Sequence, residues 1–177
     1  MEKIEPAVKL LDKYNRPYDV VDTNFVKNEH SWKLMENIEM KLYEHKVQYY
    51  ETDKMGIVHH SNYIRWMEEA RIDFLSQIGW DYKKLEDMGI ASPVTAVECK
   101  YKISTTFADL ITICVEVEEF KGVKLKLKYE MKKDDVLVCE GHSEHCFLNT
   151  EGNLINLRRE YPEFHNALTS LVGRSNF

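Results

Sequence analysis

The sequence predicts one α+β domain, in which an antiparallel sheet of about five strands wraps around one long central helix. Several segments after residue 90 alternate apolar and charged residues, as strands with one buried and one solvated face do. One long apolar segment with helical spacing, residues 61–79, is available to cover the buried face of that sheet. The 177 residues suit a single domain of ordinary size.

The composition narrows the class of protein. Hydrophobic residues make up 44% and charged residues 31%, as in globular proteins that stay in water. No apolar run reaches the roughly 18 to 20 residues of a membrane span, and the N-terminus lacks the apolar core of a signal peptide. The net charge of -6 argues against non-specific nucleic-acid binding. Four cysteines are too few for a disulfide framework, so we expect reduced thiols and a cytoplasmic protein.

The sequence predicts segments outside the domain at both ends of the chain. Residues 1–39 contain two weak helical patterns around the turn-prone stretch NRPYDVVDTN, and we expect an N-terminal extension that is helical or partly disordered. The domain itself is expected at residues 40–160, with a C-terminal tail at residues 161–177.

The first half of the domain predicts one strand and two helices. Loose alternation in KLYEHKVQYY, residues 41–50, predicts the first strand. The long helix follows at residues 61–79, with Ser61 or Asn62 as its N-cap and Gly79 as its terminator. A short second helix is expected at residues 82–88.

The second half predicts four strands joined by short turns, at residues 94–103, 111–120, 123–131 and 136–148. The third is the clearest, because Val123, Leu125 and Leu127 alternate with lysines. The turns KG and KKDD are short enough to favour an antiparallel meander.

Residues 49–71, YYETDKMGIVHHSNYIRWMEEAR, span the first strand end, a loop and the start of the long helix. This stretch resembles the signature of the 4-hydroxybenzoyl-CoA thioesterase-like family of the hotdog superfamily, and the resemblance extends over residues 41 to about 150. It implies the hotdog fold and an acyl-CoA thioester hydrolase that uses no metal or redox cofactor. It also implies a homodimer or a dimer-of-dimers tetramer, with each active site built across a subunit interface.

The resemblance assigns roles to particular residues. The catalytic aspartate of the family falls on Asp53, its turn glycine on Gly56 and its helix-entry histidine on His60. The aromatic residue that follows falls on Tyr63, and the acid-Ala-Arg element on residues 69–71.

This chain departs from the family pattern at three positions. Lys54 and Met55 replace small residues or proline, and His59 stands where an aromatic residue is usual. These departures bear on substrate preference more than on activity.

Thioester hydrolysis needs an attacking group and a donor that stabilises the developing oxyanion. Asp53 can attack as a nucleophile or activate water as a general base, and the sequence does not separate the two. Free amides of His59, His60 and Ser61 at the helix N-terminus are expected to hold the carbonyl oxygen. The predicted site comprises two catalytic residues, Asp53 and His60, and the substrate-binding residues Gly56, Ile57, Val58, His59, Ser61, Asn62 and Tyr63.

Simpler interpretations accompany these assignments. Asp53 can be a turn-forming residue without chemistry. Glu68 and Glu69 invite attention because another hotdog branch uses a helix glutamate, but ion pairs with Arg65 and Arg71 explain them. The lysine row at residues 124–128 can hold coenzyme A phosphates or can be an ordinary solvated strand face.

The stretch CEGHSEHC has the residue types of a zinc site, but its spacing argues against one. On a strand, Cys139 and His145 point to one face, while His142 and Cys146 point to the other. We therefore expect no metal.

Two other functions stay open. One is a hotdog dehydratase acting on a hydroxyacyl thioester, and the other is a non-catalytic module that binds acyl-CoA or an acyl carrier, with residues 1–39 as its effector arm. The length of the acyl chain is open too, as is the choice between coenzyme A and acyl carrier protein.

Overall fold

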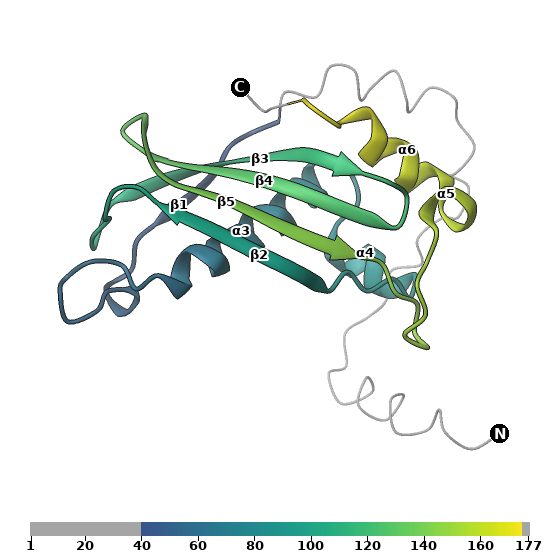
Figure 1. Cartoon of the computed structure of the whole chain (residues 1–177), viewed down its shortest axis with the longest axis horizontal. Helices are drawn as coiled ribbons and strands as arrows, with labels where there is room; N and C mark the ends of the chain where they lie inside the picture. Colours follow the sequence, from purple (N-terminus) through teal and green to yellow (C-terminus); the bar gives the residue numbers. More distant parts are fainter. Residues whose placement is uncertain (1–39, 175–177) are drawn as a thin grey trace, which may run out of the picture. The chain divides into compact units, whose positions relative to one another are not determined.

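A five-stranded antiparallel sheet forms the frame of the domain, in the order β1-β3-β4-β5-β2 (Figure 1). The computed structural model describes residues 40–174, so the N-terminal extension predicted at residues 1–39 lies outside the described residues. The strands are β1 (Tyr43–Lys46), β2 (Val94–Tyr101), β3 (Leu110–Phe120), β4 (Lys124–Lys133) and β5 (Val136–Cys146). The helices are the 3-10 turn η3 (Tyr49–Glu51), α3 (Ser61–Gln77), α4 (Tyr82–Asp87), α5 (Leu157–Glu160) and α6 (Pro162–Ser170).

The predicted meander is confirmed. β3 pairs with β4 and β4 with β5, so that Tyr129 lies between Val115 and Gly141. β1 pairs with β3 at one edge and β2 pairs with β5 at the other. The chain between β1 and β2 therefore passes from one edge of the sheet to the other, and it carries α3 and α4 on the way.

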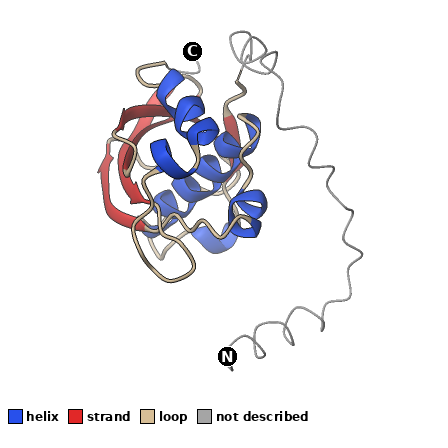
Figure 2. Cartoon of the chain, turned by 90° about the vertical axis from the view of Figure 1, so that its right-hand side faces the viewer, coloured by secondary structure: helices blue, strands red, loops and turns tan. Residues whose placement is uncertain are grey.

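Helices cover one side of the curved sheet (Figure 2). α3 buries Trp66, Met67 and Phe74 against the apolar faces of the strands. Its approach to β5 is close, because a Cβ placed on Gly141 would lie 2.8 Å from Met67 Sδ. A glycine at this position therefore lets the helix press directly onto the backbone of the sheet.

The first strand is shorter than predicted. Sequence alternation suggests a strand over residues 41–50, but β1 ends at Lys46 and residues 49–51 form η3 instead. The reason is local: the Glu51 carboxylate accepts a hydrogen bond from the Gln48 amide at 2.7 Å, which turns the chain away from the ladder. Tyr49 and Tyr50 consequently lie exposed.

Lysines and glutamates on the charged face of the sheet form ion pairs with one another. Lys126 Nζ lies 3.1 Å from Glu118 Oε1, and Lys128 Nζ lies 2.8 Å from Glu130 Oε1. The lysine row of β4 thus belongs to a solvated face of paired charges.

Side chains of β5 alternate as predicted. Cys139 and His145 are buried, whereas His142 and Cys146 lie on the other face, where His142 Nδ1 contacts Glu118 Oε2 at 2.8 Å. The four residues of the zinc-like stretch therefore do not converge, and residues 40–174 hold no cluster suited to a metal ion.

The predicted C-terminal tail contributes a helix to the core. In α6, Phe164 is fully buried and stacks on Trp80, with ring centroids 4.7 Å apart. The rings of Phe147 and Phe164 meet in an edge-to-face contact, with their centroids 5.6 Å apart. The cover of the sheet is thus shared between α3 and α6. Within the described part of the chain, no helix is both long and apolar enough to span a membrane.

Replacing Phe164 by alanine should lower the free energy of unfolding by about 3–5 kcal/mol, because the change removes a buried ring from two aromatic contacts. Urea unfolding measures the loss. Leu154→Ala, at a side chain that is 64% exposed, is the control and should change stability by less than about 1 kcal/mol. A Phe164→Ala protein as stable as this control would show that α6 is dispensable.

Candidate functional site

The loop between η3 and α3 is fixed at several points. Asp53 N donates to Ile57 O at 2.8 Å, and isolated β-bridges join Thr52 to Val58 and Ile57 to Thr106. Val58 N also donates to the backbone of Thr105, at 2.9 Å. These bonds close a tight hairpin against the segment that precedes β3.

Asp53 lies half-buried at the start of this hairpin. Its Oδ1 accepts a hydrogen bond from Met55 N at 2.7 Å, and its carbonyl accepts one from Gly56 N at 3.0 Å. Gly56 has φ +74°, a conformation that favours glycine. Asp53 therefore builds the turn with one carboxylate oxygen, while Oδ2 meets no hydrogen-bond donor among the described residues.

The entry to α3 differs from the prediction in its caps and in its free amides. The N-cap is His60, with no side-chain cap, because Ser61 Oγ bonds His59 Nδ1 at 2.8 Å and Asn62 Nδ2 donates to Glu51 O at 2.8 Å. His59 N is also engaged, donating to Glu51 O at 2.8 Å, so its predicted freedom was wrong.

Two further amides complete the helix entry. Ser61 N makes a long bond of 3.4 Å to His59 Nδ1. In residues 40–174, no acceptor takes the amide of His60. Of the three amides predicted to be free, that of His60 is thus the one still available to a ligand.

An open cleft of about 840 Å³ joins Asp53 to the helix entry. Its lining consists of Tyr49, Tyr50, Thr52, Asp53, Lys54, His59, Ser61, Asn62 and Arg65. The structure therefore brings together Asp53, His59, Ser61 and Asn62 from the predicted site. Lys54 and Arg65 add two cationic side chains that the sequence did not single out as ligands.

The other predicted residues do not line this cleft. Tyr63 is buried, and its hydroxyl bonds Thr105 Oγ1 at 2.8 Å inside the core. Val58 is buried as well, and the exposed ring of His60 lies against that of His59, with centroids 4.1 Å apart. Gly56 and Ile57 shape the hairpin.

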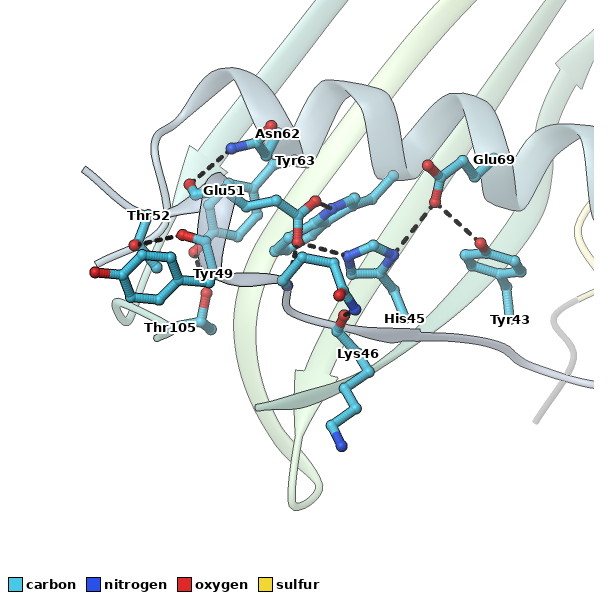
Figure 3. Close-up of polar contacts among 12 residues, drawn as sticks. Tyr43, His45, Lys46, Tyr49, Glu51, Thr52, Asn62, Tyr63, Glu69 and Thr105 are labelled. Atoms are coloured by element: carbon cyan, nitrogen blue, oxygen red, sulfur yellow. Dashed lines mark hydrogen bonds and ion pairs between the residues drawn. The ribbon is translucent and has the colours of Figure 1, made fainter. Parts of the chain in front are cut away.

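Sequence reasoning missed the role of Glu51, a residue that is only 4% exposed. Its Oε1 accepts from Trp66 Nε1 at 2.7 Å, and its Oε2 bonds His45 Nε2 at 2.9 Å besides the Gln48 amide (Figure 3). Its backbone carbonyl holds the loop and α3 through the bonds from residues 59 and 62. One residue thus ties β1, η3, the loop and α3 together.

The surroundings of Glu51 keep it ionised. Burial by itself raises the pKa of this carboxyl, but hydrogen bonds from His45, the Gln48 amide and Trp66 outweigh it and lower the pKa below the ordinary value. A charged carboxylate that accepts three hydrogen bonds is a strong local anchor.

The chain of polar contacts continues from Glu51 to the edge strand. His45 Nδ1 lies 3.3 Å from Glu69 Oε2, which also accepts from the hydroxyl of Tyr43 at 2.9 Å (Figure 3). Burial and the neighbouring Glu69 raise the pKa of Tyr43 to about 12. The sequence suggested that Glu69 pairs with an arginine of its own helix. In the structure it pairs with His45 instead. A histidine facing inward on β1, six residues before a buried acid, was the available signal.

Exchanging Glu51 for glutamine should cost about 1–3 kcal/mol of stability near pH 7, because a neutral amide cannot satisfy the same three donors. The pKa of Glu51 is lower in the folded chain than its ordinary 4.5, so its contribution is present above 4.5 and is lost as the pH falls through the folded value. Urea denaturation at about pH 7 and about pH 4 measures the free energy of unfolding of both proteins. The difference in this free energy between the wild type and Glu51→Gln should narrow at the lower pH.

Glu86→Gln is the matched control, since Glu86 is exposed on α4. It should leave stability nearly unchanged at both pH values. A gap between wild type and Glu51→Gln that is independent of pH would contradict the role given to the ionised carboxylate.

Comparison with known proteins places this geometry in a family. Residues 47–170 match the profile of the thioesterase-like superfamily. A solved DHNA-CoA thioesterase from Staphylococcus aureus is 32% identical, with a TM-score of 0.71, covering 73% of this chain and 89% of that one. A hypothetical protein from Aquifex aeolicus is 33% identical, with a TM-score of 0.68, covering 73% of this chain and 99% of that one. The acyl-CoA thioesterase YbgC of Haemophilus influenzae is 26% identical over 94 residues, which are 52% of this chain and 69% of that protein.

The matched region runs from the end of β1 to α6 and includes the cleft, the hairpin and four of the five strands. The resemblance seen in the loop sequence is thereby confirmed. This chain belongs to the thioesterase-like superfamily.

Proposed function

We propose that this protein hydrolyses an acyl-CoA thioester to a free acid and a thiol, with Asp53 as its catalytic carboxylate. The observation that carries the proposal is the single cleft lined both by Asp53 and by the start of α3. Relatives named as acyl-CoA and DHNA-CoA thioesterases support this class of reaction.

The chemistry follows from the two sides of the cleft. Asp53 has one carboxylate oxygen free to attack the thioester carbon, or to take a proton from an attacking water. Ser61 lines the cleft at the positive end of the α3 dipole, and its amide makes only a long bond of 3.4 Å. This amide and the neighbouring free amide of His60 are suited to hold the oxyanion. Collapse of the tetrahedral intermediate breaks the C–S bond, and the sulfur leaves as a thiol after it takes up a proton. On the nucleophilic route, water then cleaves the anhydride formed with Asp53, which frees the acid and restores the carboxylate. The ring of His60 does not line the cleft, so we assign it no contact with the carbonyl.

Lys54 and Arg65 are the side chains that we assign to the phosphates of coenzyme A. Both line the cleft and are exposed. Two local cations can attract a phosphorylated ligand even in a chain of net charge -6. The β4 lysines suit this role less well, because Lys126 and Lys128 already pair with glutamates.

We also propose the complete hotdog arrangement, in which the sheet wraps around α3 as its one long central helix. α3 has 17 residues, more than any other described helix, and it buries eight of them. Water and side chains suffice for the reaction, so no metal or redox cofactor is invoked. A cytoplasmic location is part of the proposal and is supported by the four free cysteines.

Asp53→Asn should reduce thiol release from a panel of acyl-CoA substrates by at least about a hundredfold, since the amide can neither attack nor act as a base. The fold should survive, because the asparagine oxygen can still accept from Met55 N. Asp135→Asn, in the exposed turn between β4 and β5, is the control and should keep full activity.

Activity retained by Asp53→Asn would rule out Asp53 as the catalytic carboxylate. Wild-type protein that binds acyl-CoA without releasing thiol would indicate a binding module. Conversion of a hydroxyacyl thioester without thiol release would indicate a dehydratase.

We also propose that the chain forms a homodimer or a dimer of dimers through β2. This strand pairs with β5 along one edge only and exposes Val94, Val97 and Tyr101. On the neighbouring α3, Ile64 and Ile72 are partly exposed as well. An open strand edge beside apolar side chains is a surface that a second copy can cover.

Val97→Lys should weaken the dimer by about 3 kcal/mol or more, because it places an unpaired charge in a buried apolar contact. Analytical ultracentrifugation measures the shift toward monomer, and thiol release should fall with the dimer fraction. Val136→Lys on β5 is the control, since Val136 is 51% exposed and Val97 is 43% exposed. A Val97→Lys protein that stays dimeric would remove β2 from the interface.

A further inference from the structure

A second, smaller cavity of about 40 Å³ lies between α3 and the sheet. It is lined by Ile64, Met67, Glu68, Arg71, Val94, Val97, Tyr129, Ser143 and His145. The apolar residues at its mouth, on α3 and β2, are exposed, whereas the polar residues at its inner end are buried. The cavity is large enough for one small polar group.

Arg71 is a buried cation at this inner end. Its side chain contacts Tyr82, with Nη1 3.2 Å from the hydroxyl and the guanidinium carbon 5.1 Å from the ring centroid, and the residue is 3% exposed. None of the carboxylates in residues 40–174 lies within 4 Å of its guanidinium. A buried charge without a counter-ion is costly, and an anion that enters the cavity would offset that cost.

A relay of hydrogen bonds supplies a second donor. Tyr129 Oη lies 2.8 Å from Ser143 Oγ, which lies 2.7 Å from His145 Nε2. Each hydroxyl proton finds an acceptor if Tyr129 donates to Ser143 and Ser143 donates to Nε2. A neutral His145 then carries its own proton on Nδ1, and this buried atom has no hydrogen-bond partner in the part of the chain described.

The charges around His145 keep it neutral. Burial and the positive charge of Arg71 lower the pKa of His145 to about 4. The carbonyl of Ser92, which accepts from Tyr82, opposes this shift but does not complete a hydrogen bond with Nδ1. Glu68 is the one acid that lines the cavity, and it is exposed at the mouth. The inner end thus presents the Arg71 guanidinium with no buried carboxylate from the described residues beside it.

We propose that this cavity binds a carboxylate at the far end of the acyl group, so that the preferred substrates are thioesters of dicarboxylic acids. This inference rests on the proposed thioester hydrolysis at Asp53. Ser61 lines the catalytic cleft, and Ile64 lines the cavity one turn later. From Ser61 to Arg71 the helix rises about 15 Å, which an extended acyl chain of about twelve carbons spans. The apolar mouth lies within the surface that we assign to a second copy, so the methylene groups run along the subunit interface.

The test compares octanoyl-CoA with its ω-carboxylated counterpart, octanedioyl-CoA, and repeats the comparison with shorter and longer matched pairs. At the best length, kcat/KM should be at least about tenfold higher for the ω-carboxylated substrate, because only that substrate pairs with the buried donors. Equal or poorer hydrolysis of the ω-carboxylated member at every length overturns the inference. Failure to release thiol from any substrate overturns the proposed function instead.

Variants locate the effect at the cavity. Arg71→Met keeps an apolar stem but removes the charge. The ratio of kcat/KM for the ω-carboxylated substrate to that for its plain counterpart should therefore fall at least about tenfold, while kcat/KM for octanoyl-CoA stays within about threefold of the wild-type value. Glu68→Gln removes the acid at the exposed mouth and should raise the preference. If Arg71→Met does not fold, Glu68→Gln decides, and an unchanged preference overturns the inference.

Binding of free octanoate, measured by calorimetry against the neutral octanamide, gives a readout that needs no turnover. The carboxylate should bind the wild type at least about tenfold more tightly than the amide, and Arg71→Met should abolish the difference. A carboxylate supplied by a second copy of the chain is the competing occupant. In that case neither compound binds at the cavity, Arg71→Met dissociates the oligomer, and the inference fails.

Discussion

The buried carboxylate of Glu51 is the constraint on which the rest of the site depends. Its two oxygens accept from β1, from the N-cap of η3 and from the indole of Trp66 on α3, and its backbone carbonyl accepts from His59 and Asn62 at the entry to that helix. A charge at this depth is tolerated only because every side of it is hydrogen-bonded. The position of the hairpin relative to the helix follows from these bonds.

This anchor separates residues that face the core from neighbouring residues that line the cleft. Glu51 and Trp66 face the core and hold the frame, whereas Asp53 and Lys54, two and three residues beyond the anchor, line the open cleft. The same division occurs along α3, where Ser61 borders the cleft and Arg71 lies at the inner end of a separate cavity. The helix therefore serves both as a core element and as a wall shared by two recesses.

Much of this arrangement could be predicted from the sequence. Alternation located β3, β4 and β5 within one to two residues, because each has one buried and one charged face. The end of β1 was misplaced, since a side chain capturing a backbone amide outweighs a strand pattern over a few residues. The motif predicted that Asp53 and the helix entry share one cleft, as they do, but it did not indicate the partners of Glu51. Those partners are far apart in the sequence and meet only when the sheet and α3 pack.

The bond from Met55 N to Asp53 Oδ1 has a consequence for how the aspartate can evolve. This bond fixes the orientation of the carboxylate, so the same side-chain conformation that accepts from the turn also sets the direction in which the second oxygen points. Glutamate carries the same charge on a stem one methylene longer, so it could keep the turn or aim an oxygen into the cleft, but not both. Charge alone therefore does not define this position, and the shorter acid is required by geometry.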